Sequence, residues 1–184
     1  MNTDTRFNEM TDIIIYGSRH GAAKRYAEGL AASTVIKALD YKKAKSLDTY
    51  KRVIYIGSIY AGGVTGLKKT VARLAPGQEF FLATVGLIAP EDKAFFDAFR
   101  EALKKQIPAS FLDEKRIFHL RGAIDFNKLE LKYRFLLKMM NSMASKTPED
   151  QQTAEMKGVQ AIYGQKVDYV DLESLKPLID ALNK

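Results

Sequence analysis

Three short segments carry the residue types that hold small anionic ligands. The first of them, Gly17–Lys24, lies between an apolar run and a helical pattern, and it combines two glycines with Ser18, Arg19 and Lys24. Main-chain N–H groups that converge at the start of a helix bind phosphate through hydrogen bonds and the helix dipole. The segment matches neither the dinucleotide GxGxxG pattern nor a Walker A loop, which ends in Gly-Lys-Ser/Thr. It indicates either a phosphate site or an ordinary turn whose glycines serve backbone geometry alone.

The other two segments, 57–63 and 84–87, also follow apolar runs and also contain glycine. Glycines let the backbone of 57–63 come close to a flat ligand, and Tyr60 can either stack on an aromatic ring or simply cover the core. The uncharged segment 84–87 would offer main-chain groups to the polar edge of a planar heterocycle. Ligands of open parallel sheets bind beyond the carboxyl ends of the strands. Taken together, the three segments therefore predict a mononucleotide site.

The composition excludes several other kinds of chemistry. The 184 residues include no cysteine, which excludes disulfides, iron–sulfur clusters, thiolate zinc sites and cysteine nucleophiles. The two histidines, His20 and His119, are too few for a histidine-rich metal site, and we expect no metal. We expect His119, inside a strand pattern, to be a satisfied core residue, and His20 either to contact an anion or to be exposed. No Ser/His/Asp elbow motif and no paired carboxylates appear, so no catalytic residue is named.

Apolar residues alternate between strand and helix patterns along the chain. Short β-branched runs predict strands at 12–16, 34–39, 51–57, 79–87 and 115–120. Apolar residues at helical spacing predict helices at 21–32, 66–74, 91–106 and from Ser174 onward. Such alternation implies a parallel sheet with helices on both faces. We therefore predict an α/β fold with a doubly wound, five-stranded parallel sheet.

One long stretch does not follow this alternation. Residues 121–166 come after the fifth strand, and we interpret them as an insertion within a single domain, 12–184. Part of the stretch, 129–143, has helical spacing, and a polar piece, 144–156, follows it. Residues 1–11 are polar and lack the apolar core of a signal peptide, so we expect them to form a flexible extension.

The formal net charge of +7 comes from two regions. Residues 1–75 hold 13 basic and 6 acidic residues, whereas 76–184 hold 16 of each. Within the second part, 115–146 holds 8 basic and 2 acidic residues. Charge confined to such regions argues against nucleic acid as a partner and for a local anionic ligand. The basic amphipathic segment 128–146 either lies on an anionic membrane, docks a partner, or packs on the core with a solvated basic side.

No apolar run reaches the length of about 20 residues that a membrane-spanning helix needs. The longest uncharged run, 53–67, has fifteen residues and contains four glycines. The absence of cysteine is compatible with a reducing cytosol. We expect a cytoplasmic protein that is peripheral at the inner face of the membrane if 128–146 binds lipid.

Four segments in this order resemble the flavodoxin-domain family: YGSRHGAAKRYA, IGSIYAGG, ATVGL and HLRGAIDFNKLELKYRFLLKMM. The similarity runs from about Asp12 to the C-terminus, and it is strongest toward the branch that contains menaquinone-dependent protoporphyrinogen IX oxidase. GSIYAGG and LRGAIDF…RFLLK are its most specific parts, because ordinary flavodoxins lack the latter. The resemblance implies a flavodoxin-like sheet and FMN bound without a covalent link. It implies that the phosphate binds Ser18, Arg19, His20, Gly21, Ala22 and Ala23. It also implies that the ring lies between Ser58, Ile59, Tyr60, Ala61 and Gly62 on one side and Thr84, Val85, Gly86 and Leu87 on the other.

The chain departs from the family pattern in two places. The family's phosphate loop usually ends in a hydroxyl residue where this chain has Ala23, which removes one hydrogen bond to the phosphate. The chain has no tryptophan, so Tyr60 is the aromatic residue placed to stack on the ring. Basic residues around the loop favour the anionic reduced flavin, and we therefore expect a reduction potential that is not very low.

Three functions stay open at this point. The first is an FMN-binding electron-transfer oxidoreductase whose partner is a redox protein, a quinone or another small molecule. The second is a quinone-dependent protoporphyrinogen IX dehydrogenase at the membrane surface, which 128–146 would contact. The third is a flavodoxin-fold binding module without catalysis that has lost FMN, and Ala23 favours it.

Overall fold

The computed structural model describes residues 12–60 and 62–184. The predicted flexible extension, Met1–Thr11, and one of the predicted ring contacts, Ala61, lie outside the described residues. The central sheet has six strands, namely β1 (Asp12–Gly17), β2 (Ala38–Asp40), β3 (Arg52–Tyr60), β4 (Gly63–Val64), β5 (Glu79–Gly86) and β6 (Ile117–Arg121). Five of these strands are parallel in the order β2-β1-β3-β5-β6, and β4 pairs antiparallel with β3. The predicted flavodoxin-like order is confirmed, with a short hairpin strand in addition.

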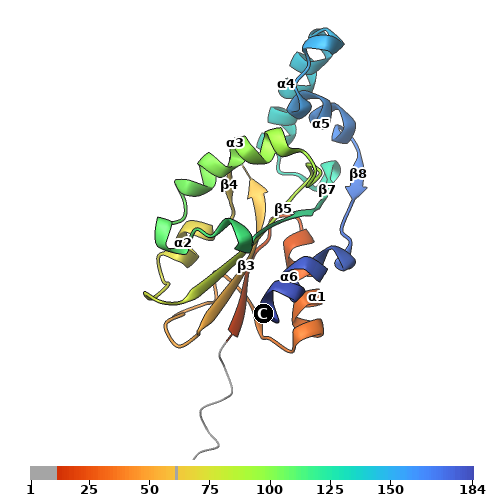
Figure 1. Cartoon of the computed structure of the whole chain (residues 1–184). Coiled ribbons are helices and arrows are strands. Elements are labelled where there is room, and N and C mark those ends of the chain that lie inside the picture. Colours follow the sequence, from red (N-terminus) through yellow and green to blue (C-terminus); the bar gives the residue numbers. More distant parts are fainter. Residues whose placement is uncertain (1–11, 61) are drawn as a thin grey trace, which may run out of the picture.

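Helices cover both faces of this sheet (Figure 1). On one face lie α1 (Ala22–Thr34) and α6 (Lys176–Leu182), and on the other lie α2 (Leu67–Val71) and α3 (Lys93–Lys104). Neighbouring residues of one strand enter opposite cores: Ile13 and Ile15 pack toward α2 and α3, whereas Ile14 packs toward α1 and α6. Burial on both faces explains why these strands read as unbroken apolar runs in the sequence.

The stretch predicted as an insertion forms a helical pair beyond the end of the sheet (Figure 1). It contains β7 (Ala123–Asp125), α4 (Leu131–Lys146), α5 (Ala154–Ile162) and β8 (Lys166–Asp168). The strands β7 and β8 pair antiparallel and bring the two ends of the stretch together. The prediction of a helix at 129–143 is confirmed as α4. Part of α5 falls in the segment that we predicted as a polar piece, and the remainder of α5 was not predicted at all.

The second strand is placed differently from the prediction of 34–39. The helix α1 continues through Thr34, whose hydroxyl donates to the carbonyl of Leu30 (2.7 Å). This bond satisfies Thr34 within the last helical turn, so the β-branched residue ends a helix instead of opening a strand. Val35 then adopts a left-handed conformation with φ 60°, and β2 begins only at Ala38.

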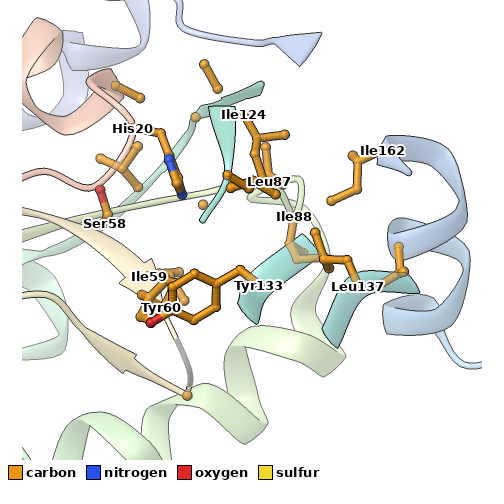
Figure 2. Close-up of a pocket in the computed structure, with 18 of the residues that line it drawn as sticks. His20, Ser58, Ile59, Tyr60, Leu87, Ile88, Ile124, Tyr133, Leu137 and Ile162 are labelled. Carbon is orange, nitrogen blue, oxygen red and sulfur yellow. The ribbon is translucent and has the colours of Figure 1, made fainter. Parts of the chain in front are cut away.

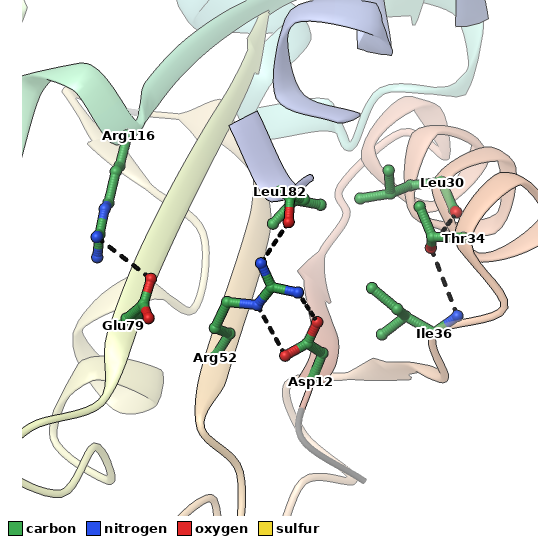
Figure 3. Close-up of polar contacts among 8 residues, drawn as sticks. All are labelled: Asp12, Leu30, Thr34, Ile36, Arg52, Glu79, Arg116 and Leu182. Carbon is green, nitrogen blue, oxygen red and sulfur yellow. Dashed lines mark hydrogen bonds and ion pairs between the residues drawn. The ribbon is translucent and has the colours of Figure 1, made fainter. Parts of the chain in front are cut away.

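An arginine fixes the opposite, amino end of the sheet (Figure 3). The guanidinium of Arg52 on β3 donates to both carboxylate oxygens of Asp12 on β1, with Nε 2.9 Å from Oδ1. The same group donates to the carbonyl of Leu182, which ends α6. The hydrogen bond to Asp12 raises the pKa of Arg52 above its ordinary value. Nearby, Arg116 and Glu79 pair at 3.2 Å and join the starts of β5 and β6.

Val35 offers a test of backbone strain without a change in packing, because its side chain is 94% exposed. A left-handed conformation costs a residue with a Cβ about 1–2 kcal/mol, whereas asparagine adopts it more readily. We expect Val35→Asn to raise the free energy of unfolding in urea by about 1 kcal/mol. Val35→Ala serves as the control and should gain less, because alanine keeps its Cβ. Equal free energies of unfolding for Val35→Asn and the wild type would contradict the backbone strain at Val35.

Candidate cofactor site at the carboxyl edge of the sheet

The register of the strands brings the three predicted ligand-binding segments together. Gly17 pairs with Gly57 across β1 and β3, and Gly57 pairs with Thr84 across β3 and β5. A cavity of about 420 Å³ opens at this edge (Figure 2), a volume typical of small-molecule sites. Nine of the residues predicted to bind a cofactor line it: His20, Ala22, Ser58, Ile59, Tyr60, Gly62, Val85, Gly86 and Leu87.

The far wall of the cavity comes from residues that the sequence did not single out. Most of them belong to the insertion, where Tyr133, Leu137 and Met140 on α4 face Val159 and Ile162 on α5. Figure 2 shows Tyr133 and Leu137 on one helix and Ile162 on another, all directed toward the same space as Leu87 and Ile88. The helical spacing of the α4 residues was visible in the sequence. The element they face was not, because that contact joins distant parts of the chain.

The first loop has the geometry of an anion site. Gly21 precedes α1 with φ 90°, and its N–H donates to the hydroxyl of Ser18 (3.1 Å). The N–H of Arg19 donates to the Ser58 hydroxyl (3.3 Å), which ties the first loop to the second. The amides of Ala22–Lys24 lie in the first turn of α1, where N–H groups have no partner within the helix. These free amides and the positive end of the helix dipole favour a bound phosphate.

Several predicted site residues direct their side chains away from the cavity. Ala23 is fully buried in the core between α1 and the sheet. Thr84 is also fully buried, and its hydroxyl is 2.6 Å from Nδ1 of His119. The guanidinium of Arg19 lies over the ring of Tyr60, 4.3 Å from the ring centre. These residues, together with Ser18 and Gly21, shape the loops without lining the cavity.

Tyr60, the predicted stacking residue, already has two neighbours. Arg19 covers one region of its ring, and Tyr133 of α4 meets it edge to face with ring centres 5.0 Å apart. Its hydroxyl is buried and has no hydrogen-bond partner among residues 12–60 and 62–184. A flavin ring that stacks on Tyr60 would share it with these two side chains.

The two histidines differ in their surroundings. His20 lines the cavity, and burial followed by the charge of Arg19 lowers its pKa, while Glu130 opposes the shift. His119 stacks on Phe96, with ring centres 3.7 Å apart, and burial there lowers its pKa to about 4. His119 thus fits the expected core histidine, and its ring is neutral at pH 7.

The polar side chains of the cavity wall are those of His20, Ser58, Tyr60 and Tyr133, and the described residues place no Asp, Glu, Lys or Arg in it. Among the side chains that the structure describes, no three His, Asp or Glu residues gather closely enough to hold a metal ion. No helix in the described part of the chain is long and apolar enough to cross a membrane. The cavity therefore borders the first turn of α1 at Ala22 and is lined by apolar side chains farther out, which fits a ligand with a phosphate and a flat ring.

The family model described as "Flavodoxin domain" matches residues 13–151. Among solved structures, oxidised flavodoxin 1 from Bacillus cereus is 13% identical, with 60% of this chain and 83% of that chain covered and a TM-score of 0.41. No curated protein matches the sequence.

The low pKa of His119 predicts a loss of stability in acid. Its folded pKa of about 4 lies below the ordinary value of 6.5, so the unfolded chain takes up the proton first. The stabilisation is therefore present above pH 6.5 and is lost as the pH falls toward 4. We expect the unfolding free energy of the wild type, measured in urea, to fall more steeply over this interval than that of His119→Gln. Parallel curves for the two proteins would show that His119 does not titrate as described.

Proposed function

Because the chain belongs to the flavodoxin domain family, we propose that it binds FMN without a covalent link and acts as an electron-transferring oxidoreductase. The observation that carries the proposal is the cavity at the carboxyl edge of the sheet, which joins the free amides of α1 to an apolar slot. When bound, FMN supplies one- and two-electron transfer, and the protein supplies position and surroundings. The described residues fit both the phosphate and the ring.

In this proposal each part of the cavity has a separate task. The amides of the first turn of α1 bind the phosphate, and Ser18 fixes the loop through Gly21. Ile59, Leu87 and Ile124 exclude water from the ring, and Tyr133 closes the outer side. Apolar contact of this kind orients a planar heterocycle without charged groups.

The reduction potential of the bound flavin depends on the charged side chains around the cavity. The basic residues that motivated it do not reach the cavity, since Lys24 pairs with Glu28 (3.5 Å) and Arg19 covers Tyr60. However, no carboxylate lines the cavity either, so repulsion of the anionic reduced ring by acidic side chains is missing. We therefore propose that the reduction potential is not very low, because the described cavity wall has no acidic side chain to repel the anionic reduced flavin.

The decisive experiment is a fluorescence titration of the protein with FMN and with riboflavin, which lacks the phosphate. We expect FMN to bind at least about tenfold more tightly, because the loop amides make charge-assisted hydrogen bonds worth about 1.5–3 kcal/mol each. Gly21→Ala, which strains the loop at φ 90°, should reduce FMN affinity and leave riboflavin affinity nearly unchanged. Absence of FMN binding, or equal affinity for both flavins, would overturn the proposal.

Gly77→Ala is the matched control for this titration. Gly77 has φ 87°, and an added Cβ would meet nothing within 4 Å, as at Gly21. It lies between α2 and β5, at the opposite edge of the sheet from the cavity. The two variants should lose similar stability, while only Gly21→Ala should lose FMN affinity.

A second candidate function is the quinone-dependent dehydrogenation of protoporphyrinogen IX at a membrane surface. Two observations favour it. The cavity is lined by apolar residues of both α4 and α5, which suits a large flat molecule. The outer face of α4 leaves Leu131 and Phe135 exposed, at 80% and 70%, beside the basic residues of the same helix. In the reaction, six electrons and six protons would leave the porphyrinogen in three successive steps, and each step would reduce one quinone to a quinol. Porphyrin fluorescence that appears only with protein, FMN and quinone together would support this candidate, and its absence would remove it.

The membrane contact has a separate test in vesicle co-sedimentation. Exposed apolar residues between lysines bind anionic lipid through burial and charge. We expect binding to vesicles rich in phosphatidylglycerol at low salt, weak binding to phosphatidylcholine, and at least about a tenfold loss of affinity with Leu131→Ser/Phe135→Ser, because burying each side chain of this size contributes about 1.5–3 kcal/mol. Leu172→Ser is the control, since Leu172 is 49% exposed but lies outside the insertion. Equal sedimentation of all three proteins would contradict the contact.

A further inference from the structure

A second hollow, of about 310 Å³, lies next to the cofactor cavity and shares Tyr60 with it. Its wall combines the first loop, the turn around β4 and the start of α2. The lining residues are Arg19, Tyr41, Tyr60, Gly63, Val64, Thr65, Gly66, Lys68, Lys69 and Gln106. Three of these side chains are cationic and none is acidic, in contrast to the uncharged wall of the cofactor cavity.

The three cations have no acidic partners of their own. Arg19, Lys68 and Lys69 form no ion pair with any residue that the structure describes. Their mutual repulsion favours any ligand that brings negative charge among them. Arg19 is held over Tyr60, so one of the three cations is already positioned.

Two residues that line the hollow, Tyr60 and Thr65, carry a hydroxyl group just beneath its surface that has no hydrogen-bond partner in the described part of the chain. The side-chain oxygens of Tyr60 and Thr65 are both buried, and neither has a partner among residues 12–60 and 62–184. Buried polar groups in native proteins are nearly always paired, with protein, water or ligand. Each hydroxyl has a proton to donate, so an oxyanion would satisfy both.

A hydrogen bond and a close contact constrain the backbone around the hollow. The N–H of Val64 donates to Oε1 of Gln106 (3.0 Å), which ties β4 to the end of α3. Gly66 has φ 80°, and a Cβ there would lie 2.6 Å from the ring of Tyr41. Thr65 and the start of α2 are thus held in place without a ligand.

We propose that this hollow binds the phosphate or carboxylate group of a small anionic ligand. Arg19, Lys68 and Lys69 balance its charge, and the hydroxyls of Thr65 and Tyr60 donate to its oxygens. The hollow shares Arg19 with the predicted FMN phosphate loop but is distinct from the cofactor cavity, because Arg19 lines the hollow whereas His20 and Ala22 line the cavity. Tyr60 contacts both spaces, so an anion bound here lies beside the cofactor.

The test is an NMR titration of the backbone amides with inorganic phosphate and, separately, with malonate, at an ionic strength kept constant with chloride. We expect saturable shifts at residues 62–69. Lys68→Gln/Lys69→Gln should weaken binding about tenfold, since hydrogen bonds to charged groups contribute about 1.5–3 kcal/mol. Lys37→Gln/Lys45→Gln removes the same charge from exposed positions outside the hollow and should leave binding unchanged. Response to phosphate alone identifies a phosphate ester as the ligand, and response to both anions identifies a general oxyanion site.

Thr65→Val separates a ligand site from a merely basic surface. Removal of an unpartnered buried hydroxyl should leave the melting temperature equal or higher, while phosphate affinity falls several-fold. The proposal is overturned if only residues 18–23 shift, if the control variant loses as much affinity as Lys68→Gln/Lys69→Gln, or if the shifts do not saturate. Repeating the titration with excess FMN keeps the two proposals distinct, because failure of FMN to bind would leave the expected shifts at 62–69 intact.

Discussion

The carboxyl edge of the sheet depends on a close approach of backbones at Gly17 and Gly57. These residues pair in register on β1 and β3, and the segment after β4 folds back directly onto them. A Cβ on Gly17 would lie 2.0 Å from the carbonyl oxygen of Thr65, and one on Gly57 would lie 2.3 Å from a methyl group of Val64. Side chains at these two positions would push the hairpin away, so the glycines are required by contact and not by unusual dihedral angles. This contact shapes both the candidate cofactor cavity and the hollow proposed to bind an anion. It sets Ser58 and Tyr60 beside the first loop, and it sets Thr65 beside Arg19.

The insertion gives this common sheet its distinctive cavity. One side of α4 lines the cavity with Tyr133, Leu137 and Met140, while another side leaves Leu131 and Phe135 exposed. Only Ala144 of the helix is buried. α4 is therefore apolar on two sides, one that lines the cavity and one that is exposed. From the sequence alone, a helix packed on the core and a helix that docks a membrane or a partner were alternatives. The inner side closes the cofactor cavity, and the outer side is the ground for the proposed membrane contact.

Much of the fold was predictable because its strands are buried on both faces. The runs around Ile13–Ile15 and Val53–Ile56 have no plausible state other than an interior strand, and their order along the chain implies the parallel sheet. The second strand was misplaced because Thr34 bonds within its own helix, which a propensity for strands cannot reveal. β7 and β8 were not predicted from the sequence because both strands are short and are defined by their pairing with each other across a long stretch of chain. α5 was not predicted because this helix begins in the segment interpreted as a polar piece. The candidate site was likewise predicted only in part. Its loops were recognisable from their glycines, but the Thr84–His119 contact and the position of Arg19 over Tyr60 depend on tertiary packing.

We propose that FMN lies in the cavity between the strand ends and the insertion, with its ring against apolar side chains from both. The most direct measurement is the set of nuclear Overhauser contacts between the ring protons of FMN and the methyl groups of the isotope-labelled protein. We expect nuclear Overhauser contacts from the FMN ring to the methyl groups of Leu87 and Ile88 on the sheet side, and to those of Ile124 and Leu137 in the insertion. Contacts confined to other methyl groups, such as those of α6, or the absence of any contact in protein saturated with FMN, would contradict it.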